Sequence, residues 1–253
     1  MGGVYEPVPA AAAVDRVRAA RGRTEVVRLE GLHALKHALR FGADIEVVIT
    51  PDRHALVDLV RMLAPDLVAT VAAMAVEVTA GDWAELAPRG LPSPALALGR
   101  RPETVEADVL AAPGRVLVLE RPRHLGNLGA AIRVAAAAGA GGVLVVDGPD
   151  PWHPTAVRAA AGLQYALPCA ATTSLSATRR PVVALDPEGA PLAGAPFPAD
   201  ALLLVGTERA GLSPELRARA DLRVAIAMRP GVSSLNLATA VAVALYHGPP
   251  GPR

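Results

Sequence analysis

The sequence predicts an α/β protein made of two units, a small N-terminal α/β unit and a larger unit with a mainly parallel sheet. Three observations predict it. Short apolar runs alternate with segments of helical spacing along most of the chain. A segment rich in Pro, Gly and Arg, residues 100–114, interrupts that alternation. Polar residues and glycines follow several of the apolar runs, where open α/β sheets bind their ligands.

The first unit is expected over residues 16–99, after a disordered leader at residues 1–15. Leu32, Leu35, Ala38 and Leu39 share one face of a predicted helix, which gives the helical assignment there. The expected elements, in order, are a strand at 25–29, a helix at 31–41, a strand at 45–50, a helix at 54–63 and a further apolar stretch at 68–78.

The second unit is expected over residues 115–247, after the linker at 100–114 and before a disordered Pro/Gly-rich tail at 248–253. Ser213 and Pro214 are typical of a helix start, as N-cap and first helical residue. The expected strands are 116–119, 143–146, 181–185, 201–205 and 224–227, and the other expected helices are 129–138, 154–162 and 235–246. This alternation predicts a mainly parallel sheet covered on both faces.

Composition narrows the function classes. The net charge of +1 argues against a protein that coats nucleic acid nonspecifically. The longest apolar run, Leu237 to Tyr246, is too short to span a membrane, and residues 1–14 lack the pattern of a secretory signal. The single cysteine, Cys169, fits a reducing cytoplasm and a small buried side chain. We therefore expect a cytoplasmic protein without a membrane partner.

Positive charge is concentrated near the N-terminus, where five arginines occupy one short segment. Arginine binds phosphate through two parallel hydrogen bonds, so this segment could hold an RNA backbone. An equally good interpretation is a solvated, partly disordered leader. The arginines concerned are Arg16, Arg18, Arg21, Arg23 and Arg28.

Three loops of the second unit combine glycines with polar side chains. The first, 121–133, contains Asn127 and Arg133; the second is 206–211, with Glu208; the third, 228–236, ends in Ser234 and Asn236. Each has a purely structural alternative: a strand-to-helix turn, a surface arginine, a solvated acid or a helix cap. None is a dinucleotide or nucleoside-triphosphate motif.

Taken in order, the three segments closely resemble the signature motifs of SpoU/TrmH-type RNA 2′-O-ribose methyltransferases, members of the knotted SPOUT superfamily. The matching segments are His124 to Arg133, Leu203 to Leu212 and Ile226 to Ala238, with Ala156 to Gly162 between them. Ala227 stands where the family usually has proline. More weakly, residues 29–50 and 91–97 resemble the substrate-binding domain of such enzymes, which is similar to small RNA-binding ribosomal proteins.

The resemblance implies an RNA-binding-like first domain, a knotted methyltransferase domain, S-adenosylmethionine as cofactor, and RNA as substrate, with ribosomal RNA favoured over transfer RNA. It also implies a homodimer with the last helix in the interface, although the apolar stripe of that helix could simply pack on its own sheet. The implied catalytic residues are Asn127, Arg133, Glu208, Ser234 and Asn236, and the implied cofactor-binding residues are Gly206, Thr207, Ile226, Met228 and Leu235.

Other interpretations stay open at this point. A noncatalytic RNA-binding protein could keep the knotted fold, and an α/β enzyme acting on a small molecule could use a nucleotide cofactor. We predict no metal site, because His33 and His37 lack a third ligand in the sequence pattern. Trp152 either stacks on an RNA base or anchors its loop to the core.

Overall fold

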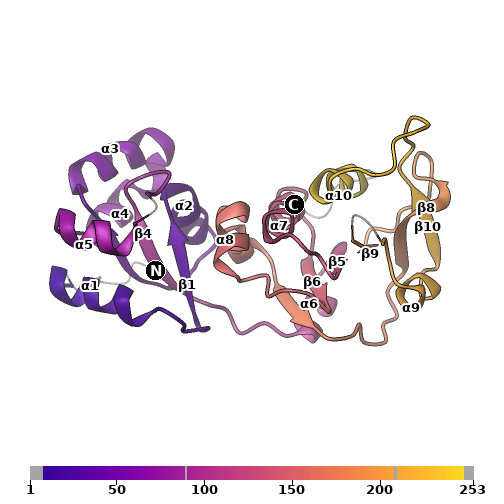
Figure 1. Cartoon of the computed structure of the whole chain (residues 1–253), viewed down its shortest axis with the longest axis horizontal. Coiled ribbons are helices and arrows are strands. Elements are labelled where there is room, and N and C mark those ends of the chain that lie inside the picture. The colour runs from indigo at the N-terminus through magenta and orange to yellow at the C-terminus, as the bar shows by residue number, and fades with distance from the viewer. Residues whose placement is uncertain (1–7, 89, 208–209, 248–253) are drawn as a thin grey trace. The chain divides into compact units, whose positions relative to one another are not determined.

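The computed structural model describes residues 8–88, 90–207 and 210–247, and the chain divides into two compact units at residues 1–102 and 103–253 (Figure 1). The division lies inside the segment expected to be a linker. That segment is partly regular, because it contains the end of strand β4 (Leu96–Arg100) and helix α6 (Glu106–Ala111). The tail at 248–253 lies outside the described residues.

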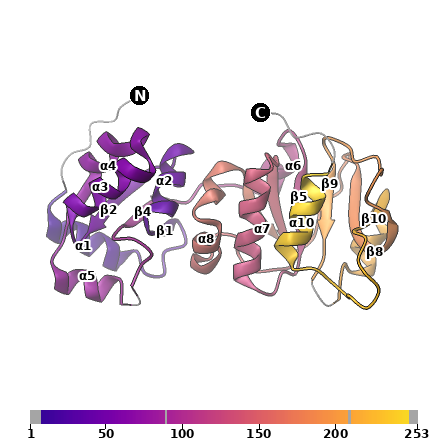
Figure 2. The ribbon, with the colours of Figure 1, turned by 90° about the horizontal axis from the view of Figure 1, so that it is seen from above.

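The first unit is a four-stranded sheet with helices on both faces (Figure 2). The strand order is β1-β4-β2-β3, with β1 and β2 antiparallel to β4 and β3 parallel to β2. The remaining strands are β1 (Val26–Glu30), β2 (Ile45–Thr50) and β3 (Ala75–Glu77). The helices are α1 (Ala10–Ala19), α2 (Leu32–Arg40), α3 (Arg53–Leu63), the 3-10 turn η1 (Pro65–Leu67), α4 (Val68–Met74) and α5 (Ala80–Leu86).

Helix α1 corrects the expectation of a disordered leader at residues 1–15. Residues 10–15 are helical, because Ala13 and Val14 are buried in one cluster with Val47 and Leu98 of the sheet. Burying this apolar face offsets the entropy lost on ordering the segment. Met1 to Pro7 lie outside the described residues.

Several of the clustered N-terminal arginines bind carboxylates of the first unit. Arg18 Nε lies 3.0 Å from Glu85 Oε1, Arg23 Nε lies 2.8 Å from Glu25 Oε1, and Arg28 Nε lies 3.0 Å from Glu30 Oε1. Arg18, Arg23 and Arg28 therefore belong to a folded surface and not to a disordered leader, and RNA binding by this cluster remains a prediction.

The second unit confirms the predicted parallel sheet. Its six strands are all parallel, in the order β10-β8-β9-β5-β6-β7. Strand β7 was not predicted, because it is short and follows directly on a turn. The strands are β5 (Val116–Glu120), β6 (Gly142–Val146), β7 (Cys169–Thr172), β8 (Val182–Pro191), β9 (Leu202–Val205) and β10 (Leu222–Ala225).

Helices cover both faces of this sheet, as expected (Figure 1). Helices α7 (Leu125–Ala137), α8 (Pro154–Ala160) and α10 (Leu237–Leu245) lie on one face, and α6 and α9 (Pro214–Ala218) pack in the core cluster of the other. The 3-10 turn η2 (Leu163–Ala166) follows α8.

Helix α7 begins four residues earlier than expected, at Leu125. Two glycines made its first turn resemble a loop in the sequence. Gly129 is needed for packing: a Cβ there would overlap the Ala156 carbonyl oxygen and lie 2.6 Å from the Ala159 Cβ. The glycine therefore lets α7 approach α8 closely.

Helix α10 packs against α7, far from the edge strand β10 that precedes it. Most of its apolar stripe is buried within the chain, chiefly against α7 and not on the sheet as the structural alternative had it: Leu237, Val241, Ala244 and Leu245. Knotting of this connection remains a prediction from the resemblance.

Trp152 anchors its loop to the core. It is 5% exposed, its Nε1 donates to the Cys169 carbonyl oxygen at 3.3 Å, and its ring meets Tyr165 edge-on. Cys169 is itself buried, and burial raises the pKa of its thiol. Within the described part of the chain, no helix has both the length and the apolar character needed to cross a membrane.

Candidate active site

The polar loops of the second unit meet at one edge of its sheet. Because all six strands are parallel, the loops that follow β5, β8, β9 and β10 leave from the same, carboxyl edge. Here the structure forms a cavity of about 180 Å³. Its lining comes from the ends of β8 and β9, the loop after β10 and the start of α10: Leu185, Asp186, Pro187, Val205, Gly206, Thr207, Gly211, Ile226, Met228, Ser233, Ser234, Leu235, Leu237 and Ala240.

All of the residues predicted to bind the cofactor line this one cavity. Gly206 and Thr207 come from the loop after β9, and Ile226, Met228 and Leu235 come from the loop after β10. The lining is chiefly aliphatic, with main-chain groups and hydroxyls between. Such a surface suits a flat aromatic group with polar edges, since ligand pockets are mostly apolar with a few placed polar groups.

Gly206 is required by a close approach of two backbone segments. A Cβ at this position would overlap the main-chain atoms of Gly211 and Leu212. Next to it, the loop closes on itself: Thr207 N donates to the Gly211 carbonyl oxygen at 3.2 Å and Gly211 N donates to that of Thr207 at 3.0 Å. The Thr207 hydroxyl also accepts from Ala210 N at 3.1 Å. These hydrogen bonds between Thr207 and Gly211 therefore fix the part of the cavity wall that the loop forms.

Asn127 and Asn236 form a bridge between α7 and α10. Asn236 Nδ2 donates to Asn127 Oδ1 at 3.0 Å. Asn236 is also the N-cap of α10, because its Oδ1 accepts from Ala238 N at 2.9 Å and Thr239 N at 3.4 Å. The capping alternative is thus present, and the same side chain makes a bond to the first motif that the sequence did not predict.

The other predicted catalytic residues have different surroundings. Ser234 is exposed and lines the cavity. Arg133 is exposed on α7, outside the cavity lining, and has no hydrogen-bond or ion-pair partner among the described residues. Glu208 lies outside the described residues. Among the described residues, therefore, no carboxylate neutralises the arginine that the motif singles out.

Sequence reasoning missed two buried carboxylates at this edge. Glu120, the last residue of β5, is 6% exposed; its Oε2 accepts from Ser213 N at 2.7 Å and its Oε1 binds Arg121 Nη2 at 3.0 Å. Asp186, in the cavity lining, is 3% exposed and its Oδ2 lies 3.3 Å from Arg223 Nη1. An acid at the end of an apolar run was the signal available for Glu120.

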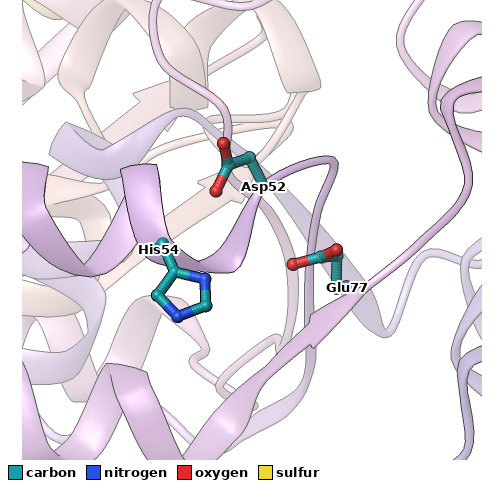
Figure 3. A group of neighbouring side chains, drawn as sticks. All are labelled: Asp52, His54 and Glu77. Atoms are coloured by element: carbon teal, nitrogen blue, oxygen red, sulfur yellow. The ribbon is translucent and has the colours of Figure 1, made fainter.

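One group of side chains in the described part of the chain could hold a metal ion, and it lies in the first unit. Figure 3 shows Asp52 and His54 at the start of α3 beside Glu77, the last residue of β3. All are exposed. The carboxylates are engaged in capping the helix, since Asp52 Oδ1 accepts from Ala55 N at 2.8 Å and Glu77 Oε2 from Arg53 N at 3.0 Å. The predicted site in the second unit does not involve this cluster.

Comparisons with known proteins agree with this geometry. Residues 114–246 match the model of the SpoU rRNA Methylase family. The 23S rRNA (uridine(2479)-2′-O)-methyltransferase of Streptomyces viridochromogenes is 35% identical over 144 residues, 51% of this chain and 50% of that protein. The match thus spans half the length of that relative. RlmP of Bacillus subtilis, a 23S rRNA (guanosine(2553)-2′-O)-methyltransferase, is 28% identical over 90% of both chains.

The whole chain also has a counterpart among solved structures. The SpoU methyltransferase AviRb of S. viridochromogenes, solved in complex with AdoMet, superposes with a TM-score of 0.73 at 25% identity, over 93% of this chain and 94% of that one. The family match covers more than half of the sequence and includes every strand of the parallel sheet and all of the cavity lining. This chain belongs to the SpoU rRNA Methylase family.

Proposed function

We propose that this protein transfers a methyl group from S-adenosylmethionine to a ribose 2′-hydroxyl of ribosomal RNA. The observation that carries the proposal is the cavity at the carboxyl edge, whose lining holds Gly206, Thr207, Ile226, Met228 and Leu235 together. The names of the relatives support the reaction, and the AdoMet complex of AviRb supports the cofactor.

The cavity suits an adenosyl group for a physical reason. Ile226, Met228 and Leu235 provide apolar contacts for an adenine ring, and the loop at Gly206 brings main-chain groups to its border. Ser234 and Thr207 add hydroxyls there. S-adenosylmethionine carries its methyl on a positively charged sulfur, so the donor is already activated and the protein's own task is to orient the acceptor.

A ribose hydroxyl is a weak nucleophile, so the site must aim its oxygen and assist loss of its proton. The transfer would form the bond between the ribose oxygen and the methyl group and break the bond between that methyl and sulfur, leaving S-adenosylhomocysteine. The hydroxyl proton would pass to Arg133 if it is the base, and otherwise to solvent water. Arg133 would act beside the target nucleotide in one of two ways. It either removes the proton of the 2′-hydroxyl as a base, or binds the neighbouring phosphate and so holds the ribose in place. Because arginine keeps its proton at neutral pH, the phosphate-binding role is the stronger on chemical grounds.

The Asn127–Asn236 bridge positions the two helices that frame the site. Asn127 lies in the first turn of α7, the helix that carries Arg133, and Asn236 starts α10 beside the cavity. Ser234 closes the loop over cofactor and substrate. Glu208 is assigned to balancing the charge of the arginines.

The proposed partners of the enzyme are RNA and a second copy of the same chain. The first unit serves as an RNA-binding domain, and ribosomal RNA is favoured over transfer RNA. The protein works in the cytoplasm as a homodimer. Val243 and Tyr246 of the last helical segment are exposed and are suited to the dimer contact, whereas the buried stripe of α10 is not.

A noncatalytic RNA-binding protein with the same fold is the alternative. Its RNA affinity would not depend on S-adenosylmethionine, and its cavity would have no cofactor to hold. The cavity lined by all five predicted cofactor-binding residues favours the enzyme, because a binder has no need of it.

Transfer of radiolabelled methyl from S-adenosylmethionine to separate pools of unmodified ribosomal and transfer RNA tests the proposal. We expect label in ribosomal RNA, recovered as a 2′-O-methyl nucleoside after digestion. Label in transfer RNA alone would overturn the substrate assignment. Absence of both labelling and cofactor binding by calorimetry would overturn the reaction.

A further inference from the structure

A second hollow continues from the cofactor cavity along the carboxyl edge of the parallel sheet. Its first part, of about 270 Å³, is lined by Arg121, Arg123, Asp147 and Thr207, among others. Its second part, of about 360 Å³, shares Asp147 and ends at Thr173. Thr207 also lines the cofactor cavity. We call the two parts together the edge groove; it leads away from the site where a methyl donor would lie.

The backbone of the edge groove is preformed by a repeated turn. Arg121 follows β5 and Asp147 follows β6, and these non-glycine residues have φ angles of 47° and 49°. Arg121 N donates to the Val146 carbonyl oxygen and Asp147 N to that of Thr172, both at 2.9 Å. Left-handed backbone at side-chain-bearing residues is strained, and such strain is concentrated at functional sites.

The two turns are packed tightly against each other. A Cβ on Gly148 would lie 2.8 Å from both Pro122 Cδ and Val145 Cγ1. Neither neighbour is the free end of a flexible side chain, so the loop after β6 is held against the loop after β5. A ligand would therefore meet a groove whose shape already exists, which lowers the entropic cost of binding.

The charged side chains of the edge groove suit two kinds of group in a ligand: a phosphate and a sugar hydroxyl. Arg121 is held by Glu120, whose buried carboxylate offsets its charge. Arg123 is exposed, and no carboxylate among the described residues neutralises it, so it is the cation of this groove suited to an anion. Asp147 is also exposed. Its carboxylate repels phosphate but accepts a hydrogen bond from a ribose 2′-hydroxyl, which DNA lacks.

We propose that the edge groove binds the RNA strand next to the methylated nucleotide, with Arg123 on a phosphate and Asp147 on a ribose 2′-hydroxyl. This inference rests on the proposed function, because it takes the ligand to be the RNA substrate. It adds a strand path and two binding residues that the motifs of the family do not include.

Filter binding of unmodified ribosomal RNA at several salt concentrations tests the role of Arg123. We expect Arg123→Ala to weaken binding roughly fivefold to tenfold. We also expect the slope of log affinity against log salt concentration to become shallower by about one, as for the loss of one phosphate contact. The matched control is Arg179→Ala, an exposed arginine just before β8 and therefore at the opposite, amino edge of the sheet. Equal affinity and equal salt dependence in Arg123→Ala and wild type would overturn the proposal.

Discrimination between RNA and DNA tests the role of Asp147. Asp147→Gly removes the carboxylate while keeping a residue that tolerates the left-handed backbone. We expect its affinity for a single-stranded RNA oligonucleotide to fall towards that for the DNA of the same sequence. An unchanged RNA preference would exclude the sugar contact.

Calorimetry with S-adenosylmethionine separates the groove from the proposed reaction. Both groove variants should bind the cofactor as wild type does. If wild type binds RNA through Arg123 but transfers no methyl, the groove stands and the proposed reaction fails. If wild type methylates RNA and neither variant alters RNA binding, the groove alone fails.

Discussion

Two arginines of the first unit, Arg18 and Arg40, have different surroundings from three of the second, Arg115, Arg123 and Arg133. In the first unit, Arg18 and Arg40 are on the surface and bind carboxylates. In the second unit, Arg115 is 5% exposed and donates to the main-chain carbonyls of Phe197 and Pro198, each at 3.1 Å. Arg133 and Arg123 have neither kind of partner in the described residues.

This difference teaches that arginine content alone does not locate an RNA-binding surface. Surface ion pairs contribute little to stability, whereas a buried guanidinium satisfies several carbonyls that would otherwise lose their hydrogen bonds. Exposed arginines without a partner keep their charge for a ligand. The N-terminal cluster that is most conspicuous in the sequence is therefore a weaker candidate for RNA than Arg123 and Arg133.

The largest effect on stability is expected for Arg115→Ala. Its guanidinium also donates to the His247 carbonyl oxygen at 3.1 Å and lies 4.5 Å from the Phe197 ring centroid. Removing it leaves several carbonyls without a donor, so we expect a loss of about 3–5 kcal/mol in the free energy of unfolding. Urea denaturation measures it. Arg100→Ala, at an exposed arginine of β4, is the control; equal losses in both would contradict the comparison.

The largest effect on cofactor binding is expected for Gly206→Ala. The added methyl would overlap the main chain of Gly211 and Leu212 and so displace the cavity wall. We expect S-adenosylmethionine to bind at least about tenfold more weakly, equivalent to about 1.4 kcal/mol, by calorimetry. Gly81→Ala in α5, where the nearest atom is 3.8 Å away, should bind like wild type. Unaltered binding by Gly206→Ala would mean that the cofactor lies elsewhere.

A smaller effect on stability is expected for Asn236→Ala. It removes both the cap of α10 and the bond to Asn127, so we expect a loss of about 1 kcal/mol and reduced methyl transfer. Asn236→Asp keeps the capping oxygen but places a carboxylate beside Asn127 Oδ1. It should keep most of the stability and lose most of the activity. Full activity of the aspartate variant would exclude a role for the bridge in the reaction.

The smallest effect is expected for Arg40→Ala, which breaks an exposed ion pair. The hydrogen bond from Arg40 lowers the pKa of Asp66. A carboxyl group with a lowered folded-state pKa stabilises the protein above its unfolded pKa of about 4 and loses that contribution as the pH falls. Arg40→Ala should thus differ slightly from wild type at neutral pH and resemble it only below the lowered folded-state pKa of Asp66, by thermal unfolding. A difference that grows towards acid pH would contradict this sign.

The sequence predicted the elements whose signal is local. Ile45–Thr50 is a strand with the expected bounds, and Ser213 caps α9 as expected through a 3.2 Å bond from Leu216 N. Elements set by tertiary packing were missed. Helix α1 is ordered by burial of Ala13 and Val14, and the close packing of α7 on α8 at Gly129 is a tertiary contact.

The residues of the candidate site likewise fall into those that the sequence could indicate and those that needed the fold. Residues within the three motifs could be assigned because the motifs, in this order, resemble those of a known family; the glycines and polar groups alone left structural alternatives open. The surroundings of Glu120 and Asp186, and the edge groove, could not be predicted, because they arise from segments that are neighbours in the fold and distant in sequence. The direct bond between Asn127 and Asn236, which lie 109 residues apart, likewise needed the fold.

The central claim is that Arg133 is kept free for the RNA substrate rather than for the fold. Single-turnover methyl transfer to ribosomal RNA, with Arg133→Ala and Arg133→Lys beside wild type, tests it most directly. We expect the alanine variant to lose at least about 100-fold in rate, the lysine variant to lose less, and all three proteins to unfold at the same temperature. An alanine variant that methylates at the wild-type rate, or one that loses activity only because it unfolds, would contradict the account.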